Sequence, residues 1–225
     1  MSSAPLFSDR TDAGEQLGQL LLTIITEQEA CIQPIVYALP RGGIPVAAPV
    51  ARLLGCPLDI VVAKKITAPQ NPELAIGAVT AEGQVLWSRQ RFLERINSNW
   101  RETALHQAQE KARSQLTEFA VGRPQVNPKG TLALVVDDGI ATGMTIAAAT
   151  QALRTHHPAQ IWICAPVAPD GLLNWLTRWC DRLVVLQAPE VFLSVSRFYV
   201  KFPQVDTQEA LVYLKQHNFG IGEAK

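Results

Sequence analysis

Short apolar runs that alternate with helix-like segments constrain the fold of this chain more than any other feature. The runs have the length of β-strands and end at turn residues: Ile35–Leu39, Leu58–Ile66, Thr131–Val136, Gln160–Val167 and Arg182–Leu186. Helical segments are predicted over Pro45–Leu54, Thr142–Thr155 and Asp170–Trp179. Apolar strands alternating with helices are typical of a parallel sheet buried on both faces. The sequence therefore predicts an α/β fold with a mostly parallel sheet and helices on both faces.

The remaining segments add elements around this alternation. An amphipathic helix is predicted near the start, a proline-containing loop and a hairpin in the middle, one or two solvated helices after them, and a last helix near the end. They cover, in order, Asp12–Glu29, Thr67–Pro72, Ala75–Thr80 with Gln84–Trp87, Arg89–Ala120, and about Thr207–Gln216.

Composition limits the partners that the chain can have. Its 225 residues suit one α/β domain with or without a small lid. The formal net charge is zero, so no overall field favours nucleic acid or an anionic membrane as partner. The four cysteines form no CxxC pair, and Met1–Arg10 lacks the pattern of a signal peptide. We therefore expect a cytoplasmic protein with reduced thiols and no membrane segment.

One strand–loop–helix segment, Val135–Thr145, carries residues suited to binding a sugar phosphate. Glycines at 139 and 143 let backbone N–H groups approach an anion, and a helix start supplies unpaired N–H donors. The acidic pair Asp137 and Asp138 would repel phosphate, but it suits hydroxyl groups or a Mg²⁺ ion beside it. The pattern is neither a Walker loop nor a dinucleotide loop. The alternative is an ordinary loop with a surface Asp pair.

The same segment resembles the phosphoribosyl pyrophosphate signature of the type I phosphoribosyltransferases. The resemblance implies that Asp137 and Asp138 bind the ribose hydroxyls. It also implies a 5-phosphate site formed by Gly139, Ile140, Ala141, Thr142, Gly143, Met144 and Thr145. The family fold would be a five-stranded sheet with a small variable hood. We expect a single domain over 1–225, with the hood formed mainly by about 188–225.

The resemblance extends to the first strand and beyond. Leu39–Gly43 is similar to the family's pyrophosphate loop, in which Arg41, Gly42 and Gly43 would bind the pyrophosphate and Pro40–Arg41 would be a cis peptide. Lys64 and Lys65 would supply further positive charge, although they could also be a solvated strand end. Asp137, Asp138, Arg41 and Lys65 are the expected catalytic residues. Pro69–Ala78 and Ser194–Phe202 also resemble a bacterial branch of the family.

The implied reaction transfers the 5-phosphoribosyl group to a nitrogenous base or similar small nucleophile and releases pyrophosphate, as in nucleotide salvage. Mg²⁺ would arrive with the substrate and not through direct side-chain ligands. A loop within about residues 67–100 would close over the site. Family members are commonly dimers or larger, so a homo-oligomer is expected.

The acceptor is only partly constrained. Members that use 6-oxopurines have an acidic residue where this chain has Ala141, so hypoxanthine or guanine is disfavoured. The hood aromatics near Val191–Phe192 and Phe198–Tyr199 could stack on a base or simply pack together.

Two other functions remain open from the sequence. The chain could be a non-catalytic regulatory module that senses phosphoribosyl pyrophosphate, or a hydrolase of the activated sugar. The neutral net charge weighs against a regulator that binds nucleic acid.

Overall fold

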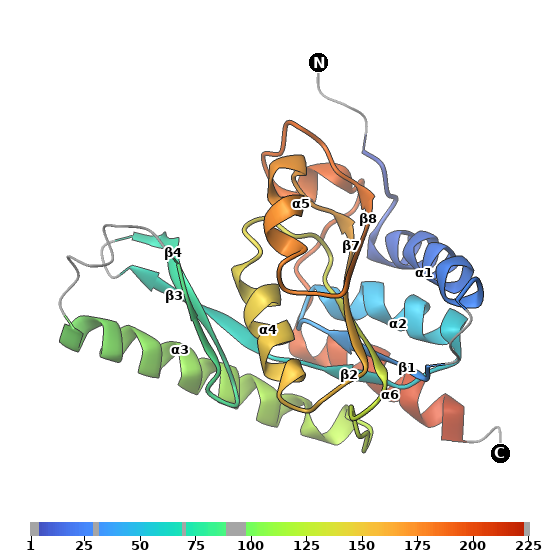
Figure 1. Ribbon diagram of the computed structural model, residues 1–225, viewed down its shortest axis with the longest axis horizontal. Coiled ribbons are helices and arrows are strands. Elements are labelled where there is room, and N and C mark those ends of the chain that lie inside the picture. The colour runs from blue at the N-terminus through green and yellow to red at the C-terminus, as the bar shows by residue number, and fades with distance from the viewer. Residues whose placement is uncertain (1–4, 29–31, 69–70, 89–97, 223–225) are drawn as a thin grey trace.

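The structure, a computed structural model, describes residues 5–28, 32–68, 71–88 and 98–222. A parallel sheet of five strands lies at its centre, in the order β2 (Leu58–Ile60), β1 (Pro34–Ala38), β6 (Leu132–Val136), β7 (Gln160–Val167) and β8 (Arg182–Gln187). Helices α1 (Arg10–Thr26) and α2 (Gly43–Leu54) cover one face, and α4 (Met144–Arg154) and α5 (Asp170–Leu176) cover the other (Figure 1). The predicted α/β fold is confirmed.

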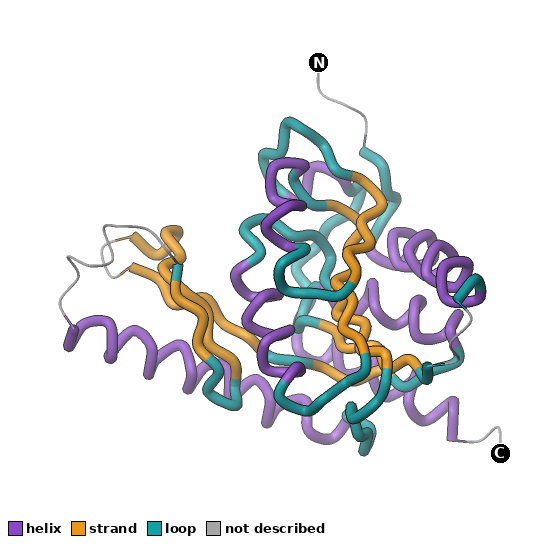
Figure 2. The backbone as a smooth tube through the Cα atoms, in the orientation of Figure 1, coloured by secondary structure: helices purple, strands orange, loops and turns teal. Residues whose placement is uncertain are grey.

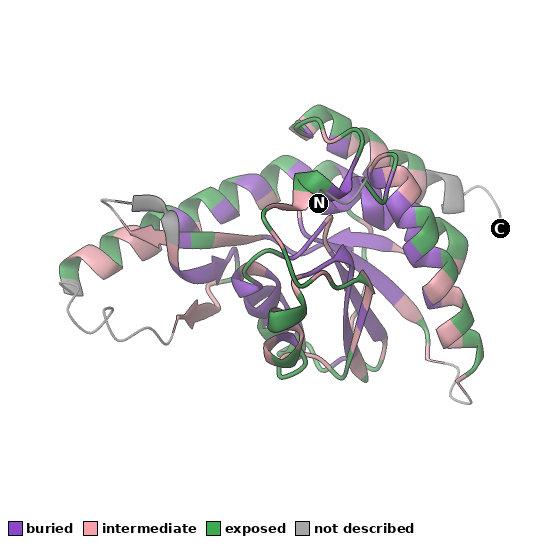
Figure 3. Ribbon diagram, turned by 90° about the horizontal axis from the view of Figure 1, so that it is seen from above, coloured by how far each residue is buried: buried purple, intermediate pink, exposed green. Residues whose placement is uncertain are grey.

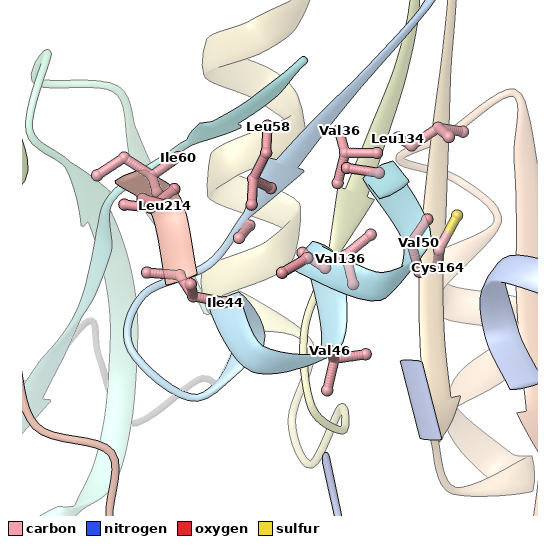
Figure 4. Close-up of a cluster of buried hydrophobic side chains, with 14 of the residues drawn as sticks. Val36, Ile44, Val46, Val50, Leu58, Ile60, Leu134, Val136, Cys164 and Leu214 are labelled. Atoms are coloured by element: carbon pink, nitrogen blue, oxygen red, sulfur yellow. The ribbon is translucent and has the colours of Figure 1, made fainter. Parts of the chain in front are cut away.

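Strand β6, at the centre of the sheet, is apolar and buried at every position because both of its faces are covered. Val36 and Leu134 face α2, whereas Tyr37 and Val135, one residue later, face α4 and α5. Figure 4 shows the first of these clusters, with Ile44 and Val50 of α2 against the strands. The view from above shows the buried residues concentrated in the sheet and on the inner helix faces (Figure 3). Alternating side chains of one strand therefore build two cores.

Helix α1 lies in direct backbone contact with α2. A Cβ atom at Gly14 would lie 2.3 Å from the carbonyl oxygen of Val46, so only glycine fits there. The side chain of Asp9 caps the helix by accepting hydrogen bonds from the backbone N–H groups of Thr11 and Asp12. This packing fixes where the first residue of α1, Arg10, projects.

A second sheet forms an arm beside the main body. Strands β3 (Ala63–Ala68), β4 (Asn71–Thr80) and β5 (Val85–Trp87) pair antiparallel, which confirms the predicted hairpin. The long helix α3 (Ser98–Phe119) packs along them, and the short 3₁₀ helix η2 (Ala120–Gly122) follows it. Figures 1 and 2 show β3, β4 and α3 extending away from the parallel sheet. We call β3–β5 and α3 the arm.

Three predictions about this region were wrong. Leu58–Ile66 is not one strand, because β2 ends at Ile60 and β3 begins at Ala63 in the other sheet. The apolar residues Ile60, Val61, Val62 and Ala63 run through the change of sheet, so no turn residue marks it. The predicted loop Thr67–Pro72 belongs largely to β3 and β4, with 69–70 outside the described residues. Helix α3 is not wholly solvated, since it buries a stripe facing the arm and the core: Ala108, Ala112, Gln115 and Phe119.

The C-terminal part divides into two regions. Helix α6 (Thr207–Gly222) packs on the main core, where Ala210 and Leu214 are fully buried in the cluster around α2. The preceding segment, 188–206, contains the 3₁₀ helix η3 (Val195–Phe198) and crosses the end of β6, where Val195 contacts the loop after that strand. No helix among the described residues combines the length and apolar character needed to cross a membrane.

Candidate functional site

Two loops meet at the carboxyl edge of the parallel sheet. They follow the neighbouring strands β1 and β6, and the backbone N–H of Leu39 donates to Val136 O at 2.9 Å. A Cβ atom at Gly42 would lie 2.2 Å from Asp138 Oδ2, and one at Gly43 would lie 2.8 Å from Val136 O. The predicted site segments 41–43 and 137–145 are therefore brought together, and glycine is required for their close approach. The peptide bond Pro40–Arg41 is cis, as predicted.

The loop after β6 encloses a cavity of about 140 Å³ at the start of α4. Gly143 precedes the helix with a φ of 74°, and its missing side chain leaves room for Trp175. The first amides of α4 have no partner within the helix, so the cavity is suited to an anion. The lining residues are Lys65, Asp137, Gly139, Ile140, Ala141, Thr142, Gly143, Thr145 and Ile146. Of the predicted phosphate residues, Met144 does not line the cavity, because its side chain packs against Ala78 and Ala148.

Asp137 of the acidic pair lines this cavity. Burial, and then the neighbouring Asp138 carboxylate, raise the pKa of Asp137 well above its usual value. Burial also raises the pKa of Asp138, and Arg10 opposes that rise. The backbone N–H of Asp138 donates to Asp137 Oδ1 at 2.9 Å. Asp137 therefore holds a proton more readily than an ordinary aspartate does.

Arg10 is a site residue that sequence reasoning missed. Its Nε donates to Asp138 Oδ2 at 2.8 Å, its Nη1 donates to Pro203 O at 2.7 Å, and its guanidinium lies 3.6 Å from the centre of the Phe202 ring. The side chains of Arg10 and Asp138 are only 9% and 15% exposed. An arginine in the first turn of a helix is no signal by itself. Only the tight packing of α1 on α2 brings it to the acidic pair.

A larger pocket of about 510 Å³ opens on the other side of the acidic pair. Its charged lining comprises three cationic side chains, Arg10, Arg41 and Lys64, and one carboxylate, Asp138. Burial, and then the nearby Arg41 charge, lower the pKa of Lys64. The excess of positive charge suits an anionic group.

Lys64 and Lys65 line different cavities. They are consecutive residues of β3, so their side chains point to opposite faces of that strand. Lys64 lines the larger pocket, and Lys65 lines the smaller cavity at the start of α4. The sequence suggested one site for both lysines because it does not show that β3 passes between the two cavities.

Gln115 of α3 also lines the larger pocket and was not predicted. Gln115 is 7% exposed, and its Oε1 atom is buried with no hydrogen-bond partner among the described residues. A buried carbonyl oxygen without a partner is costly. It marks a position where a ligand could donate a hydrogen bond.

The aromatic residues near the C-terminal end mostly pack on one another. Phe198 and Tyr199 are buried with Phe7, and the Tyr199 hydroxyl donates to Asp138 O at 2.5 Å. Phe192 stacks on Phe198 with ring centres 5.4 Å apart. Phe202, by contrast, lines the larger pocket. The packing alternative therefore holds for Phe198 and Tyr199.

Comparison with known proteins identifies relatives over most of the chain. The sequence profile described as phosphoribosyl transferase domain matches residues 16–172. Two Mycobacterium tuberculosis proteins, from strains CDC 1551 and H37Rv and named as candidate phosphoribosyl transferases, are each 34% identical over 226 residues. The alignment covers 97% of this chain and 48% of each relative, so the chain spans about half the length of these relatives.

The crystal structure of the protein TT1426 from Thermus thermophilus has the same fold. It superposes with a TM-score of 0.77 at 30% sequence identity, covering 94% of this chain and 98% of that one. The similarity therefore extends over nearly the whole of both chains.

Proposed function

The chain belongs to the phosphoribosyl transferase domain family, and we propose that it transfers the 5-phosphoribosyl group from phosphoribosyl pyrophosphate to a nitrogenous base or a similar small nucleophile, with release of pyrophosphate. One observation carries the proposal: the acidic pair separates two anion-suited cavities. Asp137 lines the small cavity at the start of α4, and Asp138 lines the larger cationic pocket. A ribose across the pair would place its 5-phosphate in the first and its pyrophosphate in the second.

Most of the predicted residues then have a role that matches their position, and Met144 is the exception because its side chain packs away from the cavity. The amides and hydroxyls of 139–145 hold the 5-phosphate, except the N–H of Ile140, which donates to Val167 O, and Lys65 adds charge beside them. Asp137 and Asp138 accept hydrogen bonds from the ribose hydroxyls. Arg41, Lys64 and the amide of Gly42 stabilise charge on the leaving pyrophosphate. The N–H of Gly43 already donates to Leu39 O at 3.0 Å, so this predicted residue contributes by allowing the close approach of the two loops. The chain accelerates the reaction by positioning the reactants and by electrostatics.

Arg10 contributes a contact to the proposed ribose site that the resemblance did not suggest. It holds one oxygen of Asp138, so a ribose hydroxyl must share that carboxylate or displace the guanidinium. Stacking on Phe202 and the bond to Pro203 O keep Arg10 in the pocket in either case. Arg10 therefore sets the orientation of Asp138.

The residues fit a Mg²⁺ ion that is carried mainly by the ligand. The two carboxylates supply the oxygen chemistry that Mg²⁺ prefers. Among the described residues, no group of three His, Cys, Asp or Glu side chains gathers to hold a metal. Bound with the pyrophosphate, Mg²⁺ would offset the charge of the leaving group.

The proposal also covers the acceptor class, the oligomeric state and the cellular location. Ala141 places no carboxylate in the phosphate loop, which disfavours 6-oxopurines. We further propose a single domain over 1–225 whose hood is the segment 188–206, a homo-oligomer, and a cytoplasmic location. The predicted covering loop within 67–100 lies partly outside the described residues, at 69–70 and 89–97. The regulatory alternative is not favoured, since the relatives carry the name of a transferase.

The test is a panel of nucleobases incubated with phosphoribosyl pyrophosphate and Mg²⁺, read by release of pyrophosphate. We expect turnover that requires both Mg²⁺ and one class of base. Binding without turnover on any acceptor would support a sensor, and turnover without an acceptor would support a hydrolase. Replacing both acidic residues by asparagine should remove most of the affinity, and unchanged affinity would place the ribose elsewhere.

A further inference from the structure

A separate cavity of about 190 Å³ lies where the arm joins the main body, away from the acidic pair. Its walls come from β1 and β2, from the turn between β4 and β5, from α3, and from the end of α4. None of the residues assigned to phosphoribosyl pyrophosphate line it. Any ligand here would therefore bind independently of the proposed reaction.

Tyr37 gives the cavity a polar group without a partner. The residue is 2% exposed, and its hydroxyl is buried with no hydrogen-bond partner among the described residues. Burial, and then the Asp59 carboxylate, raise the pKa of Tyr37, so the phenol stays neutral and able to donate. Buried hydroxyl groups normally find a partner, and a phenylalanine would avoid the cost of leaving one without.

The ion pair beside Tyr37 supplies more donors. Arg123 donates to both carboxylate oxygens of Asp59, from Nε at 2.6 Å and from Nη2 at 2.9 Å. A guanidinium has five N–H donors, so Asp59 occupies only part of this set. The side chain of Arg123 is 33% exposed, whereas that of Asp59 is 4% exposed. The remaining donors of Arg123 are available to an acceptor atom in the cavity.

Size and charge limit the ligand. An apolar cavity of about 150 Å³ can hold a benzene molecule, so 190 Å³ admits one ring and not a nucleotide. The lining contains Arg123, the two carboxylates of Asp59 and Glu82, and His156, whose Nε2 lies 3.5 Å from Glu82 Oε2, so it has no excess of positive charge that would favour an anion. The wall also includes apolar side chains, among them Ile60, Val126 and Leu153. These features favour an uncharged ring that bears a hydrogen-bond acceptor.

We propose that this cavity is a second binding site, which takes an uncharged single-ring molecule with a carbonyl or amide group directed at the Tyr37 hydroxyl and the Arg123 guanidinium. The arm supplies Thr80, Glu82 and Leu116 to its wall, and the sheet supplies Tyr37 and Asp59. A bound ring therefore bridges the arm and the main body. The same arm carries Lys64 and Gln115 to the larger pocket, so occupancy would restrict how these two side chains move.

The test measures binding of uracil, nicotinamide and benzamide to the full chain by ligand-observed NMR and calorimetry, without phosphoribosyl pyrophosphate. We expect at least one of the three to bind. Tyr37→Phe keeps the ring and removes the hydroxyl, and it should weaken binding about three- to tenfold. Tyr213→Phe, on α6 and outside the cavity, is the matched control and should leave the affinity unchanged.

Two further variants locate the bound probe. Val126→Phe fills the cavity from a loop and should abolish binding. Asp138→Asn alters the proposed ribose site and should leave binding unchanged, so failure of the proposed reaction would not affect this result. The proposal is overturned if no probe binds, if Tyr37→Phe binds as well as the natural chain, or if a crystal soaked with the probes shows only water at the Tyr37 hydroxyl.

Discussion

Arg10 Nε and Asp138 Oδ2 lie 2.8 Å apart although 128 positions separate the two residues in the sequence. The contact joins the first turn of α1 to the end of β6. It exists because glycines in α1 allow that helix to lie directly on α2. The acidic pair of the candidate site therefore depends on the N-terminal helix for its charge balance.

Replacing Arg10 by methionine should destabilise the chain by about 3–5 kcal/mol, because it leaves a largely buried carboxylate without its partner. Urea unfolding at pH 7 measures this. Arg52→Met is the matched control, since the Arg52–Glu15 pair is 63% and 56% exposed, and it should cost at most about 1 kcal/mol. Equal losses in the two variants would show that the Arg10 pair is not structurally important.

Asp137→Asn should stabilise the chain at neutral pH. The pKa of Asp137 is raised in the folded state, so the unfolded chain loses its proton first as pH rises, and folding stability falls from about pH 4 up to the folded pKa. Asparagine does not ionise, so the Asp137→Asn variant keeps the folding stability that the natural chain loses as pH rises. Thermal unfolding at several pH values should show a gain at pH 7 that vanishes below about pH 4. A gain of the same size at every pH would contradict the assignment.

Gly143→Ala should both destabilise the fold and weaken anion binding. Its φ of 74° costs an L-residue about 1–2 kcal/mol, and its Cβ atom would lie 2.6 Å from the Trp175 ring. Gly171→Ala is the control, because a Cβ atom there meets nothing within 4 Å. Unfolding measures the loss of stability, and sulfate titration measures the loss of anion affinity. Equal sulfate affinity in the Gly143 variant would argue against an anion at the start of α4.

Gln115→Leu should leave stability unchanged or raise it, because the substitution removes a buried oxygen that has no partner in the described chain. If that oxygen accepts a hydrogen bond from the substrate, KM for phosphoribosyl pyrophosphate should rise about three- to tenfold. Steady-state kinetics beside unfolding distinguishes the two effects. An unchanged KM would leave Gln115 outside the substrate contacts.

Local patterns in the sequence were enough to predict the strand–loop–helix segment at 135–145. Strand β6 is apolar at every position, glycine is needed at 143, and the acidic pair must follow the strand. These requirements involve neighbours in the chain, so the sequence expresses them directly. The cis peptide at Pro40–Arg41 was available only through the family resemblance.

The sequence by itself determined the parallel sheet, the positions of the two glycine loops and the acidic pair, because each depends on periodicity or on backbone freedom within a few residues. Only the tertiary structure decided that Arg10 reaches Asp138, that β3 leaves the main sheet, and that Lys64 and Lys65 serve different cavities. Tyr37 and Gln115 likewise look like ordinary core and helix residues until distant segments enclose them. Such contacts join residues far apart in the chain, and a single sequence has no local signal for them.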